Sequence, residues 1–176
     1  FIINTAHLSE QFPATLGNGS DRGISIQYSE EGLKDSDALE TLGGIVKALP
    51  LLSPDRKTPF VVVAGDIVTQ FDYSRLTAHA EDLLEGHHDA HLVLVPNPDF
   101  HPDGDMTLEN GLVRRTPRQW TFSSIGIYSP RIFEGIPPLP AKLFPWLYSF
   151  CDTGRITGEL YYGAWANIGT PEQLHE

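Results

Sequence analysis

Residues 60–66 (FVVVAGD) constrain the fold of this chain more than any other stretch. Four apolar residues in a row, three of them β-branched, predict a strand that is buried on both faces and lies centrally in a parallel sheet. The run ends at Gly65 and Asp66, so a small residue and a carboxylate emerge at the carboxyl end of the strand. Ligands of open α/β sheets bind at that edge. Asp66 is therefore either a ligand for a divalent cation or the cap of the following turn.

The hydrophobic pattern predicts a single α/β domain over residues 1–176, with parallel strands first and antiparallel pieces later. Asn110-Gly111 is typical of a two-residue hairpin, and Pro171 after Thr170 predicts the start of a terminal helix. Strands are expected at 1–4, 24–28, 60–63, 90–95, 106–109, 112–114, 120–128, 156–161 and 165–168, a loop at 30–37, and helices at 7–16, 45–49, 73–84, 130–133 and 142–152.

Composition excludes some classes of partner. The net charge is −11 and only 12 residues are basic, so a nucleic-acid-binding surface is not expected. An acidic protein that binds a phosphorylated ligand needs local cations, which a bound metal supplies. No apolar run is long enough to span a membrane. The single cysteine, Cys151, cannot form an internal disulfide, which fits a reducing compartment such as the cytoplasm.

Three short motifs could bind a ligand or a metal ion, and the sequence around two of them argues against such binding. Gly43-Gly44 before a helix either exposes backbone N–H groups to a ligand or forms a plain turn. The run 87–91 (HHDAH) resembles a transition-metal cluster, but its place between a helix and a strand favours a solvated turn. The polar loop 97–105 is not an EF-hand, because Asn110 stands where the bidentate glutamate is required.

An ordered set of motifs along nearly the whole chain resembles the sugar-phosphate nucleotidyltransferases. The set comprises 4–8 (NTAHL), 39–45 (LETLGGI), Gly65-Asp66, 97–105 (NPDFHPDGD), 121–123 (TFS) and 165–171 (WANIGTP). The resemblance implies a Rossmann-like fold with a mixed, mostly parallel central sheet and helices on both faces. It also implies a reaction in which a sugar 1-phosphate attacks the α-phosphate of UTP, with Mg²⁺ as the cofactor. The attacking oxygen is already anionic, so positioning and charge neutralisation are enough for catalysis.

The resemblance also assigns residues to roles. Asp66 matches the family's first metal aspartate and is the expected catalytic residue, and Asn167 stands at the position of the second metal aspartate. Nucleotide contacts are expected from Glu40, Thr41, Gly43, Gly44, Ala64 and Gly65. Sugar contacts are expected from Asn97, Gly104, Asp105, Ser123, Ser124 and Glu159.

The chain departs from the family pattern at three points. It begins at Phe1 without the family's opening strand, Gly-rich loop, arginine and lysine, so we expect the chain as given to be inactive. Asn167 offers an amide oxygen in place of a carboxylate, which predicts weaker metal binding until substrate phosphates arrive. Leu42 and Ser124 occupy positions where the family often has glycine, so either side chain could narrow the pocket.

Three alternatives remain at this stage. The enzyme could use another sugar 1-phosphate or another base. The absent loop and Asn167 are also compatible with a non-catalytic protein that binds sugar nucleotides. In the simplest alternative, an α/β interaction module, Asp66 and Gly43-Gly44 are only turn residues.

Overall fold

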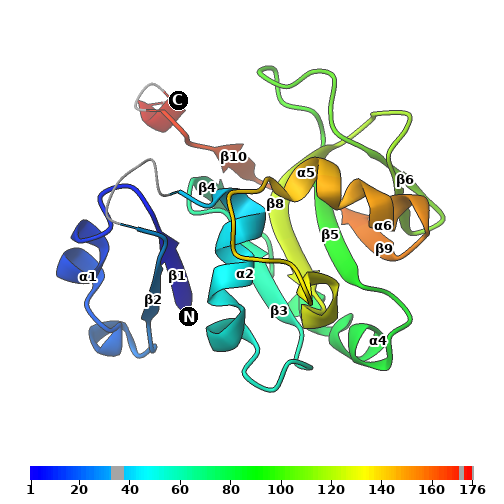
Figure 1. The fold of residues 1–176 in the computed structure, drawn as a ribbon. Coiled ribbons are helices and arrows are strands. Elements are labelled where there is room, and N and C mark those ends of the chain that lie inside the picture. The colour runs from blue at the N-terminus through cyan, green and yellow to red at the C-terminus, as the bar shows by residue number, and fades with distance from the viewer. Residues whose placement is uncertain (33–37, 171–172, 176) are drawn as a thin grey trace. The chain divides into compact units, whose positions relative to one another are not determined.

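A computed structural model describes residues 1–32, 38–170 and 173–175. The chain forms two units, Phe1–Arg56 with Phe133–Trp146 and Lys57–Ile132 with Leu147–Glu176. Figure 1 labels the helices and strands along the chain. None of the helices in the described ranges is long and apolar enough to cross a membrane.

The first unit contains a parallel strand pair and its helices. Strands β1 (Ile2–Thr5) and β2 (Gln27–Glu30) pair in parallel, and the connection between them contains α1 (Gln11–Leu16) and the 3₁₀ helix η1 (Ser20–Arg22). The predicted strand–helix–strand crossover is thereby confirmed. Helix α2 (Glu40–Leu52) packs against β1, β2 and α5 (Leu143–Trp146).

Helix α2 and the helix predicted at 142–152 differ from their predicted bounds. Helix α2 begins at Glu40, so Gly43 and Gly44 lie inside it and not before it. The helix predicted at 142–152 is divided into α5 and α6 (Tyr148–Asp152). The backbone of Phe144 is extended, with φ −106° and ψ 137°, as expected for a residue that precedes a proline.

The second unit is built on a six-stranded sheet. The strand order is β3-β8-β5-β9-β7-β6. The bounds are β3 Phe60–Val63, β5 Ala90–Val95, β6 Thr107–Glu109, β7 Leu112–Arg114, β8 Thr121–Tyr128 and β9 Ile156–Leu160. The mixed α/β class is confirmed. Within this sheet, however, only β5 and β9 pair in parallel, so the expectation of a mostly parallel sheet is wrong here.

The position predicted for residues 60–63 is also wrong. Strand β3 lies at one edge of the sheet and pairs antiparallel with β8, and Val61 and Val63 remain 40% and 38% exposed. Strand β5 is the central strand that the sequence led us to expect at β3, because all six of its residues are buried. A run of β-branched residues indicates a strand, but its neighbours in space decide whether both faces are covered.

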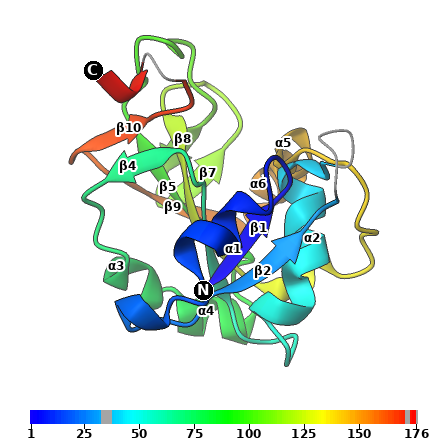
Figure 2. The same cartoon turned by 90° about the vertical axis from the view of Figure 1, so that its left-hand side faces the viewer.

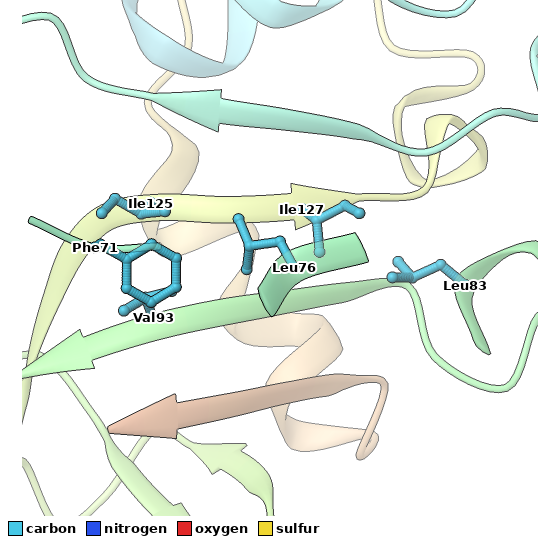
Figure 3. Packing of buried hydrophobic residues seen from close by; sticks show 6 residues of the cluster. All are labelled: Phe71, Leu76, Leu83, Val93, Ile125 and Ile127. Atoms are coloured by element: carbon cyan, nitrogen blue, oxygen red, sulfur yellow. The ribbon is translucent and has the colours of Figure 1, made fainter. Parts of the chain in front are cut away.

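Helices α3 (Ser74–Thr77) and α4 (Ala80–Glu85) cover one face of this sheet. Figure 3 shows the hydrophobic cluster at that interface, in which Leu76 and Leu83 from the helices pack against side chains of β5 and β8. The cluster consists of Phe71, Leu76, Leu83, Val93, Ile125 and Ile127. The sequence predicted one helix over 73–84, whereas the chain breaks at Ala78 and His79.

Several local predictions in this unit are confirmed. The hairpin between β6 and β7 turns at Asn110 and Gly111, which both have positive φ as such a turn requires. A 3₁₀ helix, η3 (Pro130–Phe133), follows β8. Near the end of the chain, the amide of Gln173 in η4 (Gln173–His175) donates to Thr170 Oγ1 at 3.3 Å. The rest of the predicted helix start, residues 171–172, and part of the predicted loop, residues 33–37, lie outside the described residues.

A second, two-stranded sheet positions the end of the FVVVAGD stretch. Strands β4 (Ile67–Thr69) and β10 (Trp165–Asn167) run antiparallel, with Asn167 paired to Ile67. Figures 1 and 2 both show these two strands side by side. The pairing brings Asn167 next to Asp66, although 101 positions separate them in the sequence.

Candidate functional site

Asp66 and Asn167 form one site at the end of the small sheet. The Asn167 side chain donates from Nδ2 to Asp66 Oδ2 at 3.1 Å, and the amide of Ile168 donates to the carbonyl of Asp66 at 2.6 Å. Asp66 is exposed and Asn167 is half-buried. The two residues predicted as metal ligands therefore lie together, although they come from distant parts of the sequence.

The space beside this pair suits a small cation with oxygen ligands. A Cβ at Gly169 would lie 3.2 Å from Asn167 Oδ1 and 3.6 Å from Asp66 Oδ2, so glycine keeps this space open. Mg²⁺ is usually held by one or two protein oxygens and by substrate phosphates and water. Asp66 offers a carboxylate and Asn167 an amide oxygen, so the donor set fits Mg²⁺ when Asn167 turns that oxygen toward the ion.

The backbone before Asp66 is open on one side. Gly65 is exposed, and a Cβ built there meets no heavy atom within 4 Å. The amide of Ala64 donates to the carbonyl of Ser124 at 3.1 Å, which extends the pairing of β3 and β8 by one residue. A ligand can therefore approach the backbone at Gly65, and the predicted nucleotide contacts of both residues remain predictions.

The other predicted nucleotide residues belong to the first unit and show a packing role. The amides of Leu42 and Gly43 donate to the carbonyl of Ala141, at 3.0 and 3.3 Å. A Cβ at Gly43 would overlap the carbonyl of Leu139, and one at Gly44 would overlap side chains of β1 and the loop after β2. Close packing thus explains both glycines, and the open N–H groups expected there are not present at Gly43. Glu40 and Thr41 are exposed.

Three of the predicted sugar residues form one hydrogen-bonded cluster. Asn97 accepts from Thr121 Oγ1 at 3.0 Å and donates to the carbonyl of Pro102 at 2.9 Å. Gly104, with φ +64°, lies directly against the Asn97 amide, where a Cβ would come within 2.7 Å. Asp105 accepts from the amide of Phe122 at 2.9 Å. These bonds fix the shape of the 97–105 loop.

Two further residues, His101 and Tyr148, hydrogen-bond to Asp105 and were not identified from the sequence. His101 Nε2 lies 3.0 Å from Asp105 Oδ1, and the Tyr148 hydroxyl donates to the Asp105 carbonyl at 3.2 Å. The pKa of Tyr148 is raised, mainly by burial and then by the charge of Asp105. One carboxylate oxygen of Asp105 thus contacts His101 in the loop and the other accepts from the amide of Phe122 on β8, so only the remaining lone pairs are available to a ligand.

Ser123 and Ser124 differ in their surroundings. Ser123 is fully buried, and its hydroxyl donates to the carbonyl of Val93 at 2.7 Å, where the pairing of β5 and β8 is irregular. Ser124 has φ 63°, a left-handed conformation that favours glycine. The backbone conformation alone therefore explains why glycine would suit position 124, without any requirement for space in a ligand pocket. Both sugar contacts remain predictions.

Glu159 lies in a different environment from the 97–105 loop. Its carboxylate pairs with Arg75 of α3, and Oε1 lies 3.7 Å from His91 Nε2. His79, from the break between α3 and α4, stacks on His91. The sequence placed Glu159 among the sugar residues and did not identify His79, because residues from 79 to 159 come together only through the packing of α3, β5 and β9.

The side chains of the run 87–91, whose sequence resembles a transition-metal cluster, do not point to a common position. His88 Nδ1 lies 2.7 Å from Asp82 Oδ2, whereas Asp89 accepts hydrogen bonds from Arg131 and Arg155. Burial opposes ionisation of Asp89, but the two guanidinium groups outweigh it and lower the pKa of the carboxyl. His91 has different partners: it bonds to Thr157 on β9 and stacks on His79 at the start of α4.

In a comparison with protein families, the nucleotidyl transferase family model matches residues 1–115. Among curated proteins, N-acetylmuramate alpha-1-phosphate uridylyltransferase of Neisseria meningitidis serogroup B is 41% identical over 180 residues, which cover 99% of this chain and 75% of that protein. The protein of the same name from Caulobacter vibrioides is 27% identical over 188 residues, covering 97% and 73%.

Solved structures show the same fold at low sequence identity. A putative glucose-1-phosphate thymidylyltransferase from Bacillus anthracis, in complex with a sucrose, aligns with a TM-score of 0.76 and 18% identity over 99% of this chain and 72% of that chain. HddC from Yersinia pseudotuberculosis, complexed with GMP-PN, aligns with a TM-score of 0.72 and 20% identity over 99% and 75%. The nucleotidyltransferase fold is confirmed.

The family model spans more than half of the chain, and the Neisseria relative is similar over nearly all of it. The motifs that suggested the family include the two residues that meet at the end of the small sheet, Asp66 and Asn167. The chain therefore belongs to the nucleotidyl transferase family.

Proposed function

We propose that the full-length protein is a Mg²⁺-dependent uridylyltransferase that joins N-acetylmuramate 1-phosphate to UTP, giving UDP-N-acetylmuramic acid and pyrophosphate. The observation that carries the proposal is the pairing of Asp66 with Asn167 beside the open space at Gly169. The 41% identity to a protein named for this reaction supports the choice of sugar and of base. Such a reaction belongs to peptidoglycan recycling and takes place in the cytoplasm.

In this reaction the protein has to position the two substrates and neutralise the charge of their phosphate groups. A phosphate oxygen of the sugar 1-phosphate attacks the α-phosphorus of UTP, and the bond from that phosphorus to the pyrophosphate oxygen breaks. When bound, Mg²⁺ supplies charge neutralisation for the phosphate groups. Asp66 and Asn167 would hold the ion, and Gly65 would let the nucleotide approach the backbone. No general base is needed, because the attacking oxygen is already ionised.

Asn167 changes the site in the absence of metal. Two carboxylates at this distance would repel each other, whereas the Asn167 amide donates a hydrogen bond to Asp66 at 3.1 Å. The pair is therefore stable without a cation, and binding of the ion must replace that hydrogen bond. Asp66 and Asn167 would therefore hold Mg²⁺ more tightly once substrate phosphates provide the charge that Asn167 lacks.

The remaining contacts are proposed on the resemblance to the family. By this resemblance Ala64 and Gly65 contact the nucleotide, Glu40 and Thr41 are further nucleotide contacts, and Asn97, Gly104 and Asp105 contact the sugar. Gly43 and Gly44 belong to the same motif, but they are buried by close packing inside α2. Residues 1–176 act as a single nucleotidyltransferase domain that works together with the family's Gly-rich opening segment.

The test is release of pyrophosphate by the full-length protein with UTP, Mg²⁺ and a panel of sugar 1-phosphates. We expect release with N-acetylmuramate 1-phosphate and at least about tenfold less with glucose or mannose 1-phosphate, a discrimination that one or two lost hydrogen bonds produce. Release with another sugar alone would overturn the proposed substrate. Binding of UTP without release for any sugar would overturn the proposed activity and favour a sugar-nucleotide sensor.

A further inference from the structure

His79, His91 and Glu159 meet at the border of the hydrophobic cluster between the six-stranded sheet and its helices. His91 is on β5 and Glu159 on β9, two strands that pair in parallel with Val93 opposite Glu159. His79 lies at the start of α4, and its ring stacks on that of His91 with centroids 3.5 Å apart and planes 15° apart. One possible ligand atom from each residue lies within 4.8 Å of the others. Val93 and Leu83 of the adjoining cluster are labelled in Figure 3.

The hydrogen bonds of His91 show where its ring carries a proton. Nδ1 lies 2.9 Å from Thr157 Oγ1, and the Thr157 hydroxyl donates to the carbonyl of Ala90 at 3.3 Å. Because the hydroxyl has one hydrogen and directs it to Ala90, this network assigns the ring proton of His91 to Nδ1, with the Thr157 oxygen as its acceptor. The other nitrogen, Nε2, then presents a lone pair toward Glu159.

Two electron-rich atoms consequently face each other in a buried space. Among the described residues, only three buried side-chain polar atoms have no hydrogen-bond partner, and two of them are His91 Nε2 and Glu159 Oε1. They lie 3.7 Å apart. Leaving two buried acceptors opposite each other is unfavourable, and a cation between them removes the cost.

Neighbouring side chains hold His91 and Glu159 in place. The Nδ1 atom of His91 is bonded to Thr157. The other carboxylate oxygen of Glu159 pairs with Arg75, whose guanidinium also lies 5.4 Å from the ring centroid of Phe71. Thr157 and Arg75 thus orient the inner two residues in the way that outer-shell partners orient metal ligands.

We propose that His79, His91 and Glu159 bind a divalent transition-metal ion, of which Zn²⁺ is the reference case. Two imidazole nitrogens and one carboxylate oxygen suit Zn²⁺ and not Mg²⁺, which prefers oxygen ligands. His79 is half-buried, so its ring can turn from the stack to direct a nitrogen at the ion, and water takes the fourth position. The ion joins the break between α3 and α4 to β5 and β9, and its role is to stabilise this unit.

The test is a titration of the chelator-treated full-length protein with Zn²⁺ in excess Mg²⁺, which keeps hard oxygen sites filled. We expect one Zn²⁺ per chain and a rise in Tm of about 5–10 °C at 100 times the Kd. His79→Ala and Glu159→Gln each weaken binding by at least about 100-fold and remove the rise in Tm. X-ray absorption at the zinc edge shows two imidazole ligands in the wild-type protein.

The control is His87→Ala, a change of the same residue type at a neighbouring, exposed position. This variant retains both the zinc affinity and the rise in Tm. Because each Tm shift is measured against the same variant without zinc, a lower starting stability does not obscure the result. The proposal is overturned if wild-type protein does not bind Zn²⁺, in which case water fills the space. It is also overturned if His79→Ala and Glu159→Gln bind as tightly as wild type, which indicates an adventitious surface ion only.

Discussion

The second unit contains two groups of residues suited to hold a cation, and they are opposite in almost every respect. Asp66 and Asn167 are exposed or half-buried, offer only oxygen, and are already joined by a hydrogen bond. His91 is buried and Glu159 is half-buried. The two atoms that face each other, His91 Nε2 and Glu159 Oε1, are both buried and have no hydrogen-bond partner among the described residues. Exposure and a satisfied hydrogen bond suit an ion that enters and leaves with substrate. Burial and unsatisfied acceptors suit an ion that stays.

The largest effect that separates the two groups is expected from Asp66→Ala. Removing the carboxylate takes away the only formal negative charge of the Asp66–Asn167 pair, so turnover of the full-length enzyme falls about 10²–10³-fold. Pyrophosphate release at saturating UTP and Mg²⁺ measures the loss. His79→Ala, assayed in parallel, retains turnover at 25 °C.

The exposed carboxylate of Asp72 provides the matched control, since it bonds locally to Ser74 at the start of α3. Asp72→Asn leaves turnover within about twofold of wild type. If Asp66→Ala were as active as Asp72→Asn, Asp66 would be only a turn residue and the proposed metal role would be wrong.

An intermediate effect is expected at Asp89, a buried carboxylate whose oxygens are both paired. Arg131 Nε and Arg155 Nε lie 2.6 and 2.9 Å from its two oxygens. Asp89→Asn therefore lowers the free energy of unfolding by about 1–3 kcal/mol, less than for a fully buried pair because both arginines are one-third exposed. Urea denaturation at pH 7 measures the difference.

The same carboxylate predicts a dependence on pH. The folded pKa of Asp89 is lowered, so its contribution is fully present above the ordinary value of 3.8 and is lost as pH falls through the folded pKa. The stability difference between wild type and Asp89→Asn should shrink below pH 4 and stay constant from pH 5 to 7. A difference that persists unchanged to pH 2 would contradict the assigned pairing.

The smallest effect is expected from Asn167→Asp. A second carboxylate strengthens the attraction for Mg²⁺ but introduces repulsion with Asp66 in the metal-free protein. The Mg²⁺ concentration that gives half-maximal pyrophosphate release should fall about tenfold, while zinc binding at the histidine cluster stays unchanged. An unaltered or higher Mg²⁺ requirement would show that Asn167 does not contact the ion.

The fold was predictable where local sequence decides structure. The turn at Asn110-Gly111 and strand β5 follow from residue type and short-range pattern. The central position of β3 did not follow, because the same apolar run serves a half-exposed edge strand. The start of α2 was also misplaced, since Gly43 and Gly44 meet close packing inside a helix whose neighbours, not its propensities, require glycine.

The candidate sites also differ in whether sequence motifs or only the three-dimensional structure could identify them. Asp66 and Asn167 could be predicted together only because their motifs resemble a family in an ordered way, and the pairing of β4 with β10 brings them into contact. The cluster of His79, His91 and Glu159 carries no short motif. Its members are brought together by a helix break and a parallel strand pair, so only the three-dimensional structure reveals it.

The most direct test is a crystal structure of the full-length protein with UTP, Mn²⁺ in place of Mg²⁺, and Zn²⁺, using anomalous scattering at each metal edge. We predict a manganese peak between Asp66, Asn167 and the UTP phosphates, and a separate zinc peak among His79, His91 and Glu159. A manganese peak that touches the UTP phosphates but neither Asp66 nor Asn167 would contradict the assignment of the catalytic metal site.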